Sequence, residues 1–218
     1  MTNNRLNHRH DYLPAAQHDA LLPAYDLMSR LLGIGAVHQT LIAHADLTDG
    51  DRVLEIGSGT GNLTLRAKRS RPGIDVVGID PDPLALARAR RKLNGETGIR
   101  FDQGYAQTLP YADQAFDRVL SSLMLHHLDS DGTAAALAEA FRVLRPGGRL
   151  HIVDVGADTT EHDGRLARFF ARRRRAAAHF GAPIPELVRA AGFDCAEDGM
   201  QRRPVVGPLM FYRATRPS

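Results

Sequence analysis

Residues 53–61 read Val-Leu-Glu-Ile-Gly-Ser-Gly-Thr-Gly, an apolar run that leads into three glycines at alternate positions. Glycine has no Cβ and readily adopts positive φ, so a strand can turn sharply here and a ligand can approach the main chain. One carboxylate, Glu55, precedes the first glycine by two residues. The stretch predicts a buried strand followed by a loop that binds a ligand against its backbone.

The spacing of the glycines distinguishes this loop from two others. Gly57, Gly59 and Gly61 give G-x-G-x-G, and Asn62 stands where a dinucleotide fingerprint has its third glycine. No Gly-Lys-Ser/Thr follows, which excludes a P-loop. A second apolar run ends at Asp80, about 20 residues downstream, the distance at which a carboxylate meets ribose hydroxyls in doubly wound folds. The two signals together indicate a nucleoside-containing ligand.

Three further blocks follow in order, at residues 101–111, 116–128 and 142–150. With the glycine loop and Asp80, they resemble the class I S-adenosylmethionine-dependent methyltransferases. The resemblance extends over residues 40–155 and is to the small-molecule branch, which includes quinone-precursor and sugar methyltransferases. It implies S-adenosyl-L-methionine as cofactor and a small, hydrophobic methyl acceptor.

The resemblance also implies which residues bind the cofactor. They lie at the ends of the first four strands or on the loops that follow: Glu55, Gly57, Ser58, Gly59, Asp80, Pro81, Ala106, Gln107 and Ser121. Asp80 would bind both ribose hydroxyls. The family usually has an acidic residue at position 105 for the adenine amino group, and this chain has Tyr105. Tyr105 itself, Asp102 or Gln107 would then recognise adenine.

Two residues are predicted to be catalytic. Methyl transfer depends mainly on proximity and alignment, and a base is needed only where the nucleophile must lose a proton. His126 follows the fourth strand and Asp154 ends the fifth, so both should lie beyond the carboxyl ends of the strands, where open α/β sheets bind ligands. An imidazole oriented by a carboxylate is a suitable general base for O- or C-methylation. His127, Tyr12 and Tyr25 are the predicted substrate contacts.

Structural roles compete with each of these interpretations. The Leu-His-His segment could form a loop in which one imidazole caps the following helix. Asp154 could hydrogen-bond loop amides, and Tyr12 and Tyr25 could be core tyrosines with satisfied hydroxyls. From the residues alone, these alternatives stay open.

Other functions are less well supported by the motifs. A nucleic-acid amino-methyltransferase would carry Asn- or Asp-Pro-Pro-aromatic after the fourth strand, where residues 121–124 read Ser-Ser-Leu-Met. The paired-glutamate loop of arginine methyltransferases and the Asp-Asn pair of metal-dependent catechol-type enzymes are missing from the sequence. The alternative from a different class is a noncatalytic methyltransferase-like module that acts through partners.

Composition agrees with a small enzyme. A chain of 218 residues with 43% hydrophobic content fits one α/β domain. No stretch approaches the ~20 apolar residues of a membrane span, and no signal-peptide pattern opens the chain, so we expect a cytoplasmic protein. Cys195 is the single cysteine, and His8, His10 and His18 are too loosely spaced to predict a metal site. A net charge of +3 argues against a nucleic-acid partner.

The strongest local charge is the run of four arginines at residues 172–175. It lies in a segment with helical apolar spacing, so its main interpretation is the solvated edge of a helix that covers the active-site mouth. Recognition of an anionic substrate, of nucleic acid or of a membrane surface remains an alternative.

The elements alternate along the chain. Apolar runs at 52–56, 75–79, 99–102, 117–121 and 149–154 are separated by helical stretches at 60–70, 83–94 and 132–144, and another follows at 164–180. This order predicts a Rossmann-like doubly wound α/β sheet with right-handed crossovers. The runs at 193–197 and 207–213 have no helix between them, so they should pair antiparallel.

Shorter signals refine the boundaries. Asp82, Pro83 and Thr133 are plausible helix starts, and residues 146–148 read as a Pro-Gly-Gly turn. The predicted organisation is a single domain, with a disordered tail at 1–11, a helical cap at 12–45, a cofactor-binding core at 46–156, a helical cover at 157–185, and a C-terminal helix and β-hairpin at 186–218.

Overall fold

The structure, a computed structural model, describes residues 32–156, 183–203 and 206–218. Several predictions lie outside these ranges. They concern the tail at 1–11, the cap residues 12–31 with Tyr12 and Tyr25, and the cover residues 157–182 with the arginine run. The domain boundaries therefore stay predictions, whereas the sheet and its connections can be compared directly.

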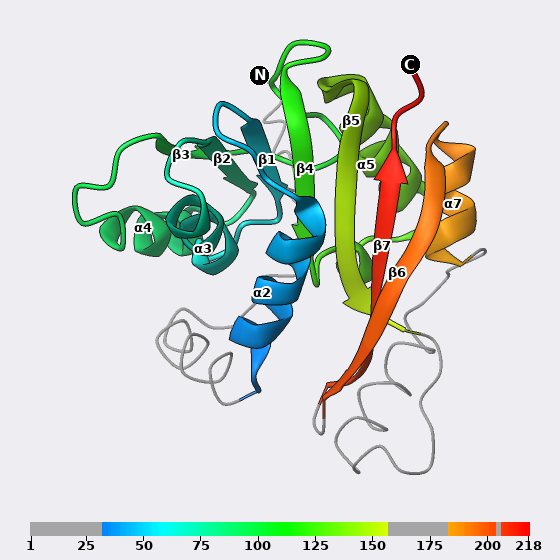
Figure 1. Cartoon of the computed structure of the whole chain (residues 1–218), viewed down its shortest axis with the longest axis horizontal. Helices are drawn as coiled ribbons and strands as arrows, with labels where there is room; N and C mark the ends of the chain where they lie inside the picture. The colour runs from blue at the N-terminus through cyan, green and yellow to red at the C-terminus, as the bar shows by residue number, and fades with distance from the viewer. Residues whose placement is uncertain (1–31, 157–182, 204–205) are drawn as a thin grey trace, which may run out of the picture.

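In the described part of the chain, seven strands form one sheet in the order β3-β2-β1-β4-β5-β7-β6 (Figure 1). The strands are β1 (Arg52–Ile56), β2 (Asp75–Asp80), β3 (Ile99–Gln103), β4 (Phe116–Ser122), β5 (Leu144–Val155), β6 (Asp194–Arg203) and β7 (Gly207–Thr215). The pairs among β1 to β5 are parallel, and β7 is antiparallel to both β5 and β6. The predicted fold class and its antiparallel ending are confirmed.

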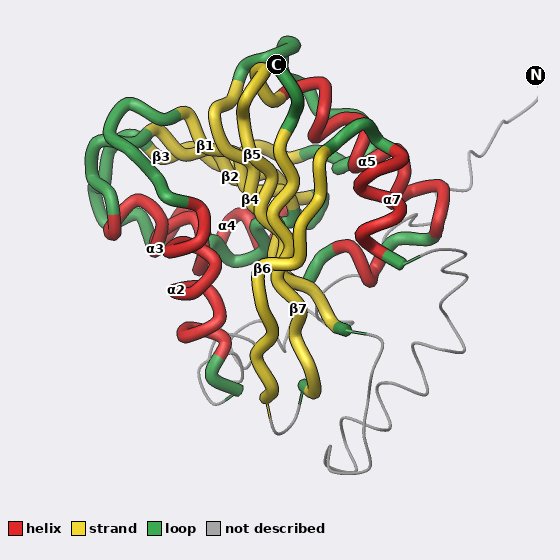
Figure 2. The backbone as a smooth tube through the Cα atoms, turned by 45° about the vertical axis from the view of Figure 1, so that its right-hand side comes forward, coloured by secondary structure: helices red, strands yellow, loops and turns green. Residues whose placement is uncertain are grey.

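Helices cover both faces of this sheet (Figures 1 and 2). One core cluster joins α2 (Ile34–Ala45) and α3 (Asn62–Ser70) to the sheet through Val53 of β1, whereas Leu54 belongs to the cluster with α5 (Ser130–Val143) and α7 (Ile184–Ala190). Successive strand residues point to opposite faces, which explains why neighbours join different clusters. A third cluster packs α4 (Pro83–Arg91) on Phe101 of β3. The 3-10 turn η2 (Leu125–His127) follows β4.

The sequence predicted the starts of two helices, and the structure confirms the first and contradicts the second. Asp82 is the N-cap of α4, its side chain accepts hydrogen bonds from two main-chain N–H groups of the first turn, and Pro83 occupies the first position, as predicted. The prediction at Thr133 is wrong, because Asp129 is the N-cap of α5 and Thr133 is fully buried inside the helix. The Thr133 N–H already donates to the carbonyl of Asp129 within the helix, so Thr133 lies beyond the position of the cap.

The predicted turn at residues 146–148 lies inside β5. Phe116 of β4 pairs with Leu144 of β5, but Arg118 pairs with Arg149, so β5 bulges between these two pairs. Gly147 adopts φ 72° within the bulge. The main chain of the bulge hydrogen-bonds to the segment after β7. These hydrogen bonds keep the segment in the sheet, so the Pro-Gly-Gly sequence bends the strand without ending it.

Leu120 of β4 gives a direct test of the buried face. Its exposed fraction is 0%. We expect Leu120→Ala to lower the free energy of unfolding by about 2–5 kcal/mol, because it leaves a cavity among well-packed side chains. Leu84→Ala on α4, where the leucine is 46% exposed, is the matched control and should cost less than about 0.5 kcal/mol. Urea denaturation measures both, and equal losses would contradict the packing.

Candidate active site

The glycine loop after β1 is held by the main chain of β2. The N–H groups of Gly57 and Ser58 donate to the carbonyl of Ile79, at 2.9 and 3.0 Å. Gly57, Gly59 and Gly61 all have positive φ, at 77°, 51° and 77°. A Cβ on Gly57 would collide with Met124, but a Cβ on Gly59 would meet no atom within 4 Å. Gly59 therefore presents bare backbone to open space.

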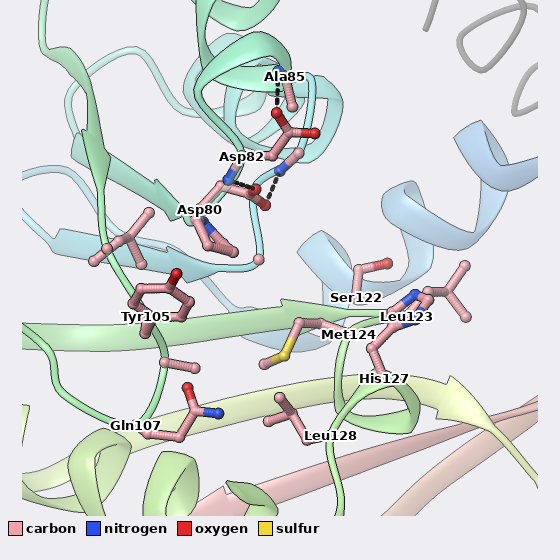
Figure 3. A pocket seen from close by; sticks show the side chains of 16 residues that line it. Asp80, Asp82, Ala85, Tyr105, Gln107, Ser122, Leu123, Met124, His127 and Leu128 are labelled. Carbon is pink, nitrogen blue, oxygen red and sulfur yellow. Dashed lines mark hydrogen bonds between the residues drawn. The ribbon is translucent and has the colours of Figure 1, made fainter. Parts of the chain in front are cut away.

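Asp80 at the tip of β2 faces the same space (Figure 3). Its Oδ2 accepts from the Gly59 N–H at 2.7 Å, and its Oδ1 accepts from the Asp82 N–H at 2.9 Å. Burial raises the pKa of this carboxyl despite these two hydrogen bonds. Each carboxylate oxygen has a further lone pair, so Asp80 can still accept hydrogen bonds from two hydroxyls of a ligand.

A pocket forms beyond the carboxyl ends of β1, β2, β3 and β4, next to the point where the strand order reverses between β1 and β4. Ligands bind at this place in open α/β sheets. We call it the first pocket (Figure 3), and it is lined by Gly57, Gly59, Ile79, Asp80, Pro81, Asp82, Ala85, Gly104, Tyr105, Ala106, Gln107, Ser122, Leu123, Met124, His127 and Leu128.

Tyr105 and Gln107 are the polar side chains by which the loop after β3 lines the first pocket. Tyr105 is 45% exposed. Asp102, the other candidate for adenine recognition, accepts a hydrogen bond from the Tyr111 hydroxyl at 3.0 Å and pairs with Arg100 at 2.9 Å. It does not line the first pocket, so the two residues that remain placed for adenine are Tyr105 and Gln107.

Ser121 lies away from the first pocket. It lines a small internal cavity together with Ile56 and Leu150, whereas its neighbour Ser122 lines the first pocket. The two serines point to opposite faces because they are successive residues of β4. The predicted cofactor contact at Ser121 is therefore not supported by its position, and strand alternation would have pointed to Ser122.

His126 and Asp154 lie together, although 28 residues separate them. His126 Nδ1 is 2.7 Å from Asp154 Oδ1. The Asp154 side chain is fully buried and also accepts from the Val155 N–H at 2.7 Å, so it serves both the imidazole and a main-chain N–H at the end of β5. Burial alone would raise the pKa of Asp154, but His126 lowers it below the ordinary value. Asp154 is therefore a charged partner for His126 at neutral pH.

His127 occupies a different position from His126. His127 lines the first pocket, and its ring centroid is 4.1 Å from that of His126. Neither imidazole caps the next helix, because Asp129 takes that role in α5. The alternative interpretation of the Leu-His-His segment as a helix cap is therefore wrong.

Leu123 was not predicted to contribute to the site. It has φ 54°, and its N–H donates to the carbonyl of Val153 at 2.8 Å. Non-glycine residues in this conformation are uncommon and cluster at functional sites. The sequence carries no signal for it, because leucine does not favour positive φ.

Glu55 and Ser58 lie on the other side of the glycine loop, beneath α2. They belong to what we call the second cavity, lined by Ile34, His38, Glu55, Gly57, Ser58, Gly59, Thr60, Asn62, Leu63, Ser122 and Leu123. Glu55 is buried and accepts a hydrogen bond from the Thr64 hydroxyl. Burial raises the pKa of Glu55 to about 8. The second cavity shares Gly57, Gly59, Ser122 and Leu123 with the first pocket.

Among the described residues, no three His, Cys, Asp or Glu side chains are grouped so that they could hold a metal ion. In the same part of the chain, no helix is long and apolar enough to cross a membrane.

Comparisons with known proteins agree with this geometry. The family model for a methyltransferase domain matches residues 53–148. A demethylmenaquinone methyltransferase from Thermus thermophilus is 38% identical over 182 residues, which cover 78% of this chain and 82% of the relative. One from Deinococcus radiodurans is 36% identical over 139 residues, 62% of this chain and 57% of the relative.

The fold is also found among solved structures. Phosphoethanolamine N-methyltransferase 2 of Haemonchus contortus, in complex with S-adenosyl-L-methionine, matches with a TM-score of 0.73 and 18% identity, over 92% of this chain and 58% of that one. At this identity the likeness concerns the fold alone.

The chain belongs to the class I S-adenosylmethionine-dependent methyltransferases, in the small-molecule branch. It is therefore an enzyme with S-adenosyl-L-methionine as cofactor, and the methyltransferase prediction is favoured over the noncatalytic module. The described residues fit this cofactor, because Gly59 leaves the backbone open, Asp80 keeps acceptor capacity, and Ser58 and Ser122 have buried hydroxyls without a partner in the described chain.

Proposed function

We propose that this enzyme methylates a ring carbon of a reduced quinone similar to demethylmenaquinone. The similarity to the Thermus thermophilus and Deinococcus radiodurans methyltransferases supports this acceptor class. A relative from Desulfotalea psychrophila, 32% identical over 139 residues, carries the name of a C-methyltransferase, which supports carbon as the methylated atom. The cytoplasmic location and the absence of a nucleic-acid partner stay predictions from the sequence.

The observation that carries the proposal is the pairing of His126 with Asp154 beside the first pocket. The charged carboxylate at 2.7 Å favours the tautomer in which Nδ1 carries the proton and donates it. Nε2 then has a free lone pair and can accept a proton. The sulfonium of the cofactor supplies an electrophilic methyl group when it is bound.

A ring carbon of a hydroquinone becomes a good nucleophile when the hydroxyl conjugated with it loses its proton. In the proposed step, His126 Nε2 takes that hydroxyl proton, a carbon–carbon bond to the methyl forms, and the carbon–sulfur bond breaks. Loss of the proton on the methylated carbon then restores the aromatic ring, and the oxygen recovers its proton from His126. One proton is released in total, and no oxidant or reductant is consumed.

The lining of the first pocket supports a hydrophobic acceptor. Leu123, Met124 and Leu128 line it on the side of His127, opposite Asp80 and Asp82 (Figure 3). A polar ribose at one end and an apolar ring at the other would match this distribution. His127, which lines the pocket, is the proposed contact to the acceptor.

The test is a transfer assay with S-adenosylmethionine and a short-chain demethylmenaquinone, offered in the reduced and the oxidised form. We expect the reduced form alone to gain one CH₂ unit by mass spectrometry, with the new methyl on carbon. A phenol or sugar hydroxyl methylated faster than the hydroquinone would replace the proposal with O-methylation. Turnover of the oxidised quinone would contradict the proton transfer through His126.

A further inference from the structure

Tyr105 and Gln107, the two residues placed for adenine, lie on a loop without regular secondary structure (Figure 3). The loop comprises residues 104–115, between β3 and β4. Its main chain hydrogen-bonds to β2 near its start and to α5 near its end. Since the residues between these two points belong to no helix or strand, contacts from side chains must fix the middle of the loop.

Arg142 of α5 contacts the middle of this loop. Its Nη2 donates to the carbonyl of Leu109 at 3.0 Å, and its Nη1 donates to the carbonyl of Tyr111 at 2.8 Å. Nη1 also donates to the carboxylate of Asp113 at 2.7 Å. A guanidinium carries five N–H donors in one rigid plane, so a single side chain holds two main-chain carbonyls at a fixed separation.

Glu139 lies one turn before Arg142 on the same helix and binds both Arg142 and the loop. Its Oε1 accepts from Arg142 Nε at 2.7 Å, and its Oε2 accepts from Arg142 Nη2 at 2.9 Å. Oε2 also accepts from the Leu109 N–H at 2.6 Å. The Arg142 guanidinium lowers the pKa of Glu139, so the carboxylate is charged at neutral pH. Both polar main-chain groups of Leu109 are therefore bound by side chains of α5.

Leu109 links this anchor to the first pocket. Its side chain is 5% exposed and packs in the core cluster that contains α5. Gln107 precedes it by two residues and Tyr105 by four, and both line the first pocket. Without the anchor, the loop would occupy its present position for only part of the time. A ligand that needs this position would then bind more weakly by the same fraction.

We propose that Arg142 and Glu139 are positioning residues for recognition of adenine, because they hold the loop against α5 so that Tyr105 and Gln107 meet the base. Neither Arg142 nor Glu139 lines the first pocket, so both act through the loop and not by contact with the ligand. The inference rests on the cofactor and is independent of the methyl acceptor. No local motif indicates this role, since 33 residues separate Leu109 from Arg142.

The experiment measures binding by isothermal titration, with no acceptor present. The probes are S-adenosylhomocysteine and S-ribosylhomocysteine, which share the ribose and the amino acid and differ in the presence of adenine. We expect Arg142→Met to weaken binding of S-adenosylhomocysteine by roughly 10- to 100-fold, because the loop would be in its binding position for only a fraction of the time. Affinity for S-ribosylhomocysteine should stay nearly unchanged, since it has no base to contact the loop.

Arg216→Met is the matched control near the same end of α5. Arg216 Nη1 donates to three main-chain carbonyls, those of Phe141, Arg142 and Leu144. Its loss also removes guanidinium hydrogen bonds to the backbone, but none of them involves the loop. We expect Arg216→Met to lower the free energy of unfolding and to leave the ratio of the two affinities unchanged. The proposal is wrong if this control changes the ratio as Arg142→Met does.

A merely structural role for Arg142 predicts a different result. Arg142→Met would then weaken binding of both probes equally, or of neither, and either outcome would overturn the proposal. Glu139→Gln keeps the test decisive if Arg142→Met does not fold, because the amide retains the shape of the side chain and removes only the charge. We expect a smaller loss of affinity that is again confined to S-adenosylhomocysteine. Wild-type affinity for both probes in Glu139→Gln would contradict its role.

Discussion

Gly59→Val should abolish cofactor binding while the protein remains folded. The glycine has φ 51°, and a Cβ there would meet no protein atom within 4 Å, so a valine side chain would project into the space that the ligand needs. Inserting extra carbon atoms into a well-packed site costs about 1–3 kcal/mol or more, and we expect affinity for S-adenosylhomocysteine to fall by more than roughly 100-fold. Titration calorimetry measures the loss.

Backbone strain must be separated from the blocked ligand. Valine at positive φ is disfavoured wherever it occurs. Gly95→Val is the matched control, since Gly95 has φ 83°, also has no atom within 4 Å of its Cβ position, and lies on the loop after α4 outside both cavities. We expect Gly95→Val to lower the free energy of unfolding about as much as Gly59→Val does, with no loss of affinity for S-adenosylhomocysteine. A Gly57→Val variant would test the loop less cleanly, because a Cβ at Gly57 would collide with Met124 of the protein itself. Normal binding by Gly59→Val would refute the role of the loop.

The fold followed from the sequence because its signals are local. Apolar runs of strand length, a glycine loop and helix caps such as Asp82 each depend on neighbouring residues, and together they predicted a doubly wound, mostly parallel sheet with an antiparallel ending. The sequence did not predict the bulge at 146–148, because the segment that hydrogen-bonds to it follows β7, more than sixty residues away in the chain.

The site was predicted less completely, for a physical reason. Motifs indicate which loops meet, but they do not fix which side chain of a pair points into the pocket. Because strand residues alternate between faces, Ser122 lines the first pocket and Ser121, the predicted contact, does not. The positive φ of Leu123 then sets the direction of the chain into η2. Asp102, a candidate for adenine from the sequence, instead accepts a hydrogen bond from Tyr111, which no local motif indicates.

The second large effect is expected at the histidines. His126→Ala should lower kcat by roughly 100- to 10,000-fold, the usual range for a positioned general base, with affinity for S-adenosylhomocysteine nearly unchanged. His126 does not line the first pocket, so its removal leaves the pocket residues in place. The amount of methylated product formed from the reduced quinone over time gives kcat, and titration calorimetry gives the affinity for the cofactor.

Asp154→Asn tests the orientation of His126. Asp154 holds His126 Nδ1 at 2.7 Å, and an asparagine retains the shape while removing the charge that favours this tautomer. We expect a smaller loss of kcat than for His126→Ala, because the base itself remains. Some loss of stability is also expected, since the side chain is fully buried and accepts from the Val155 N–H.

His127→Ala decides between the two imidazoles. His127 lines the first pocket and lies 4.1 Å from His126, centroid to centroid, so as an acceptor contact it should change KM more than kcat. If His127→Ala instead causes the large loss of kcat and His126→Ala a small one, His127 is the base and His126 with Asp154 positions it. Wild-type turnover in both variants would leave alignment of the acceptor, without a base, as the mechanism.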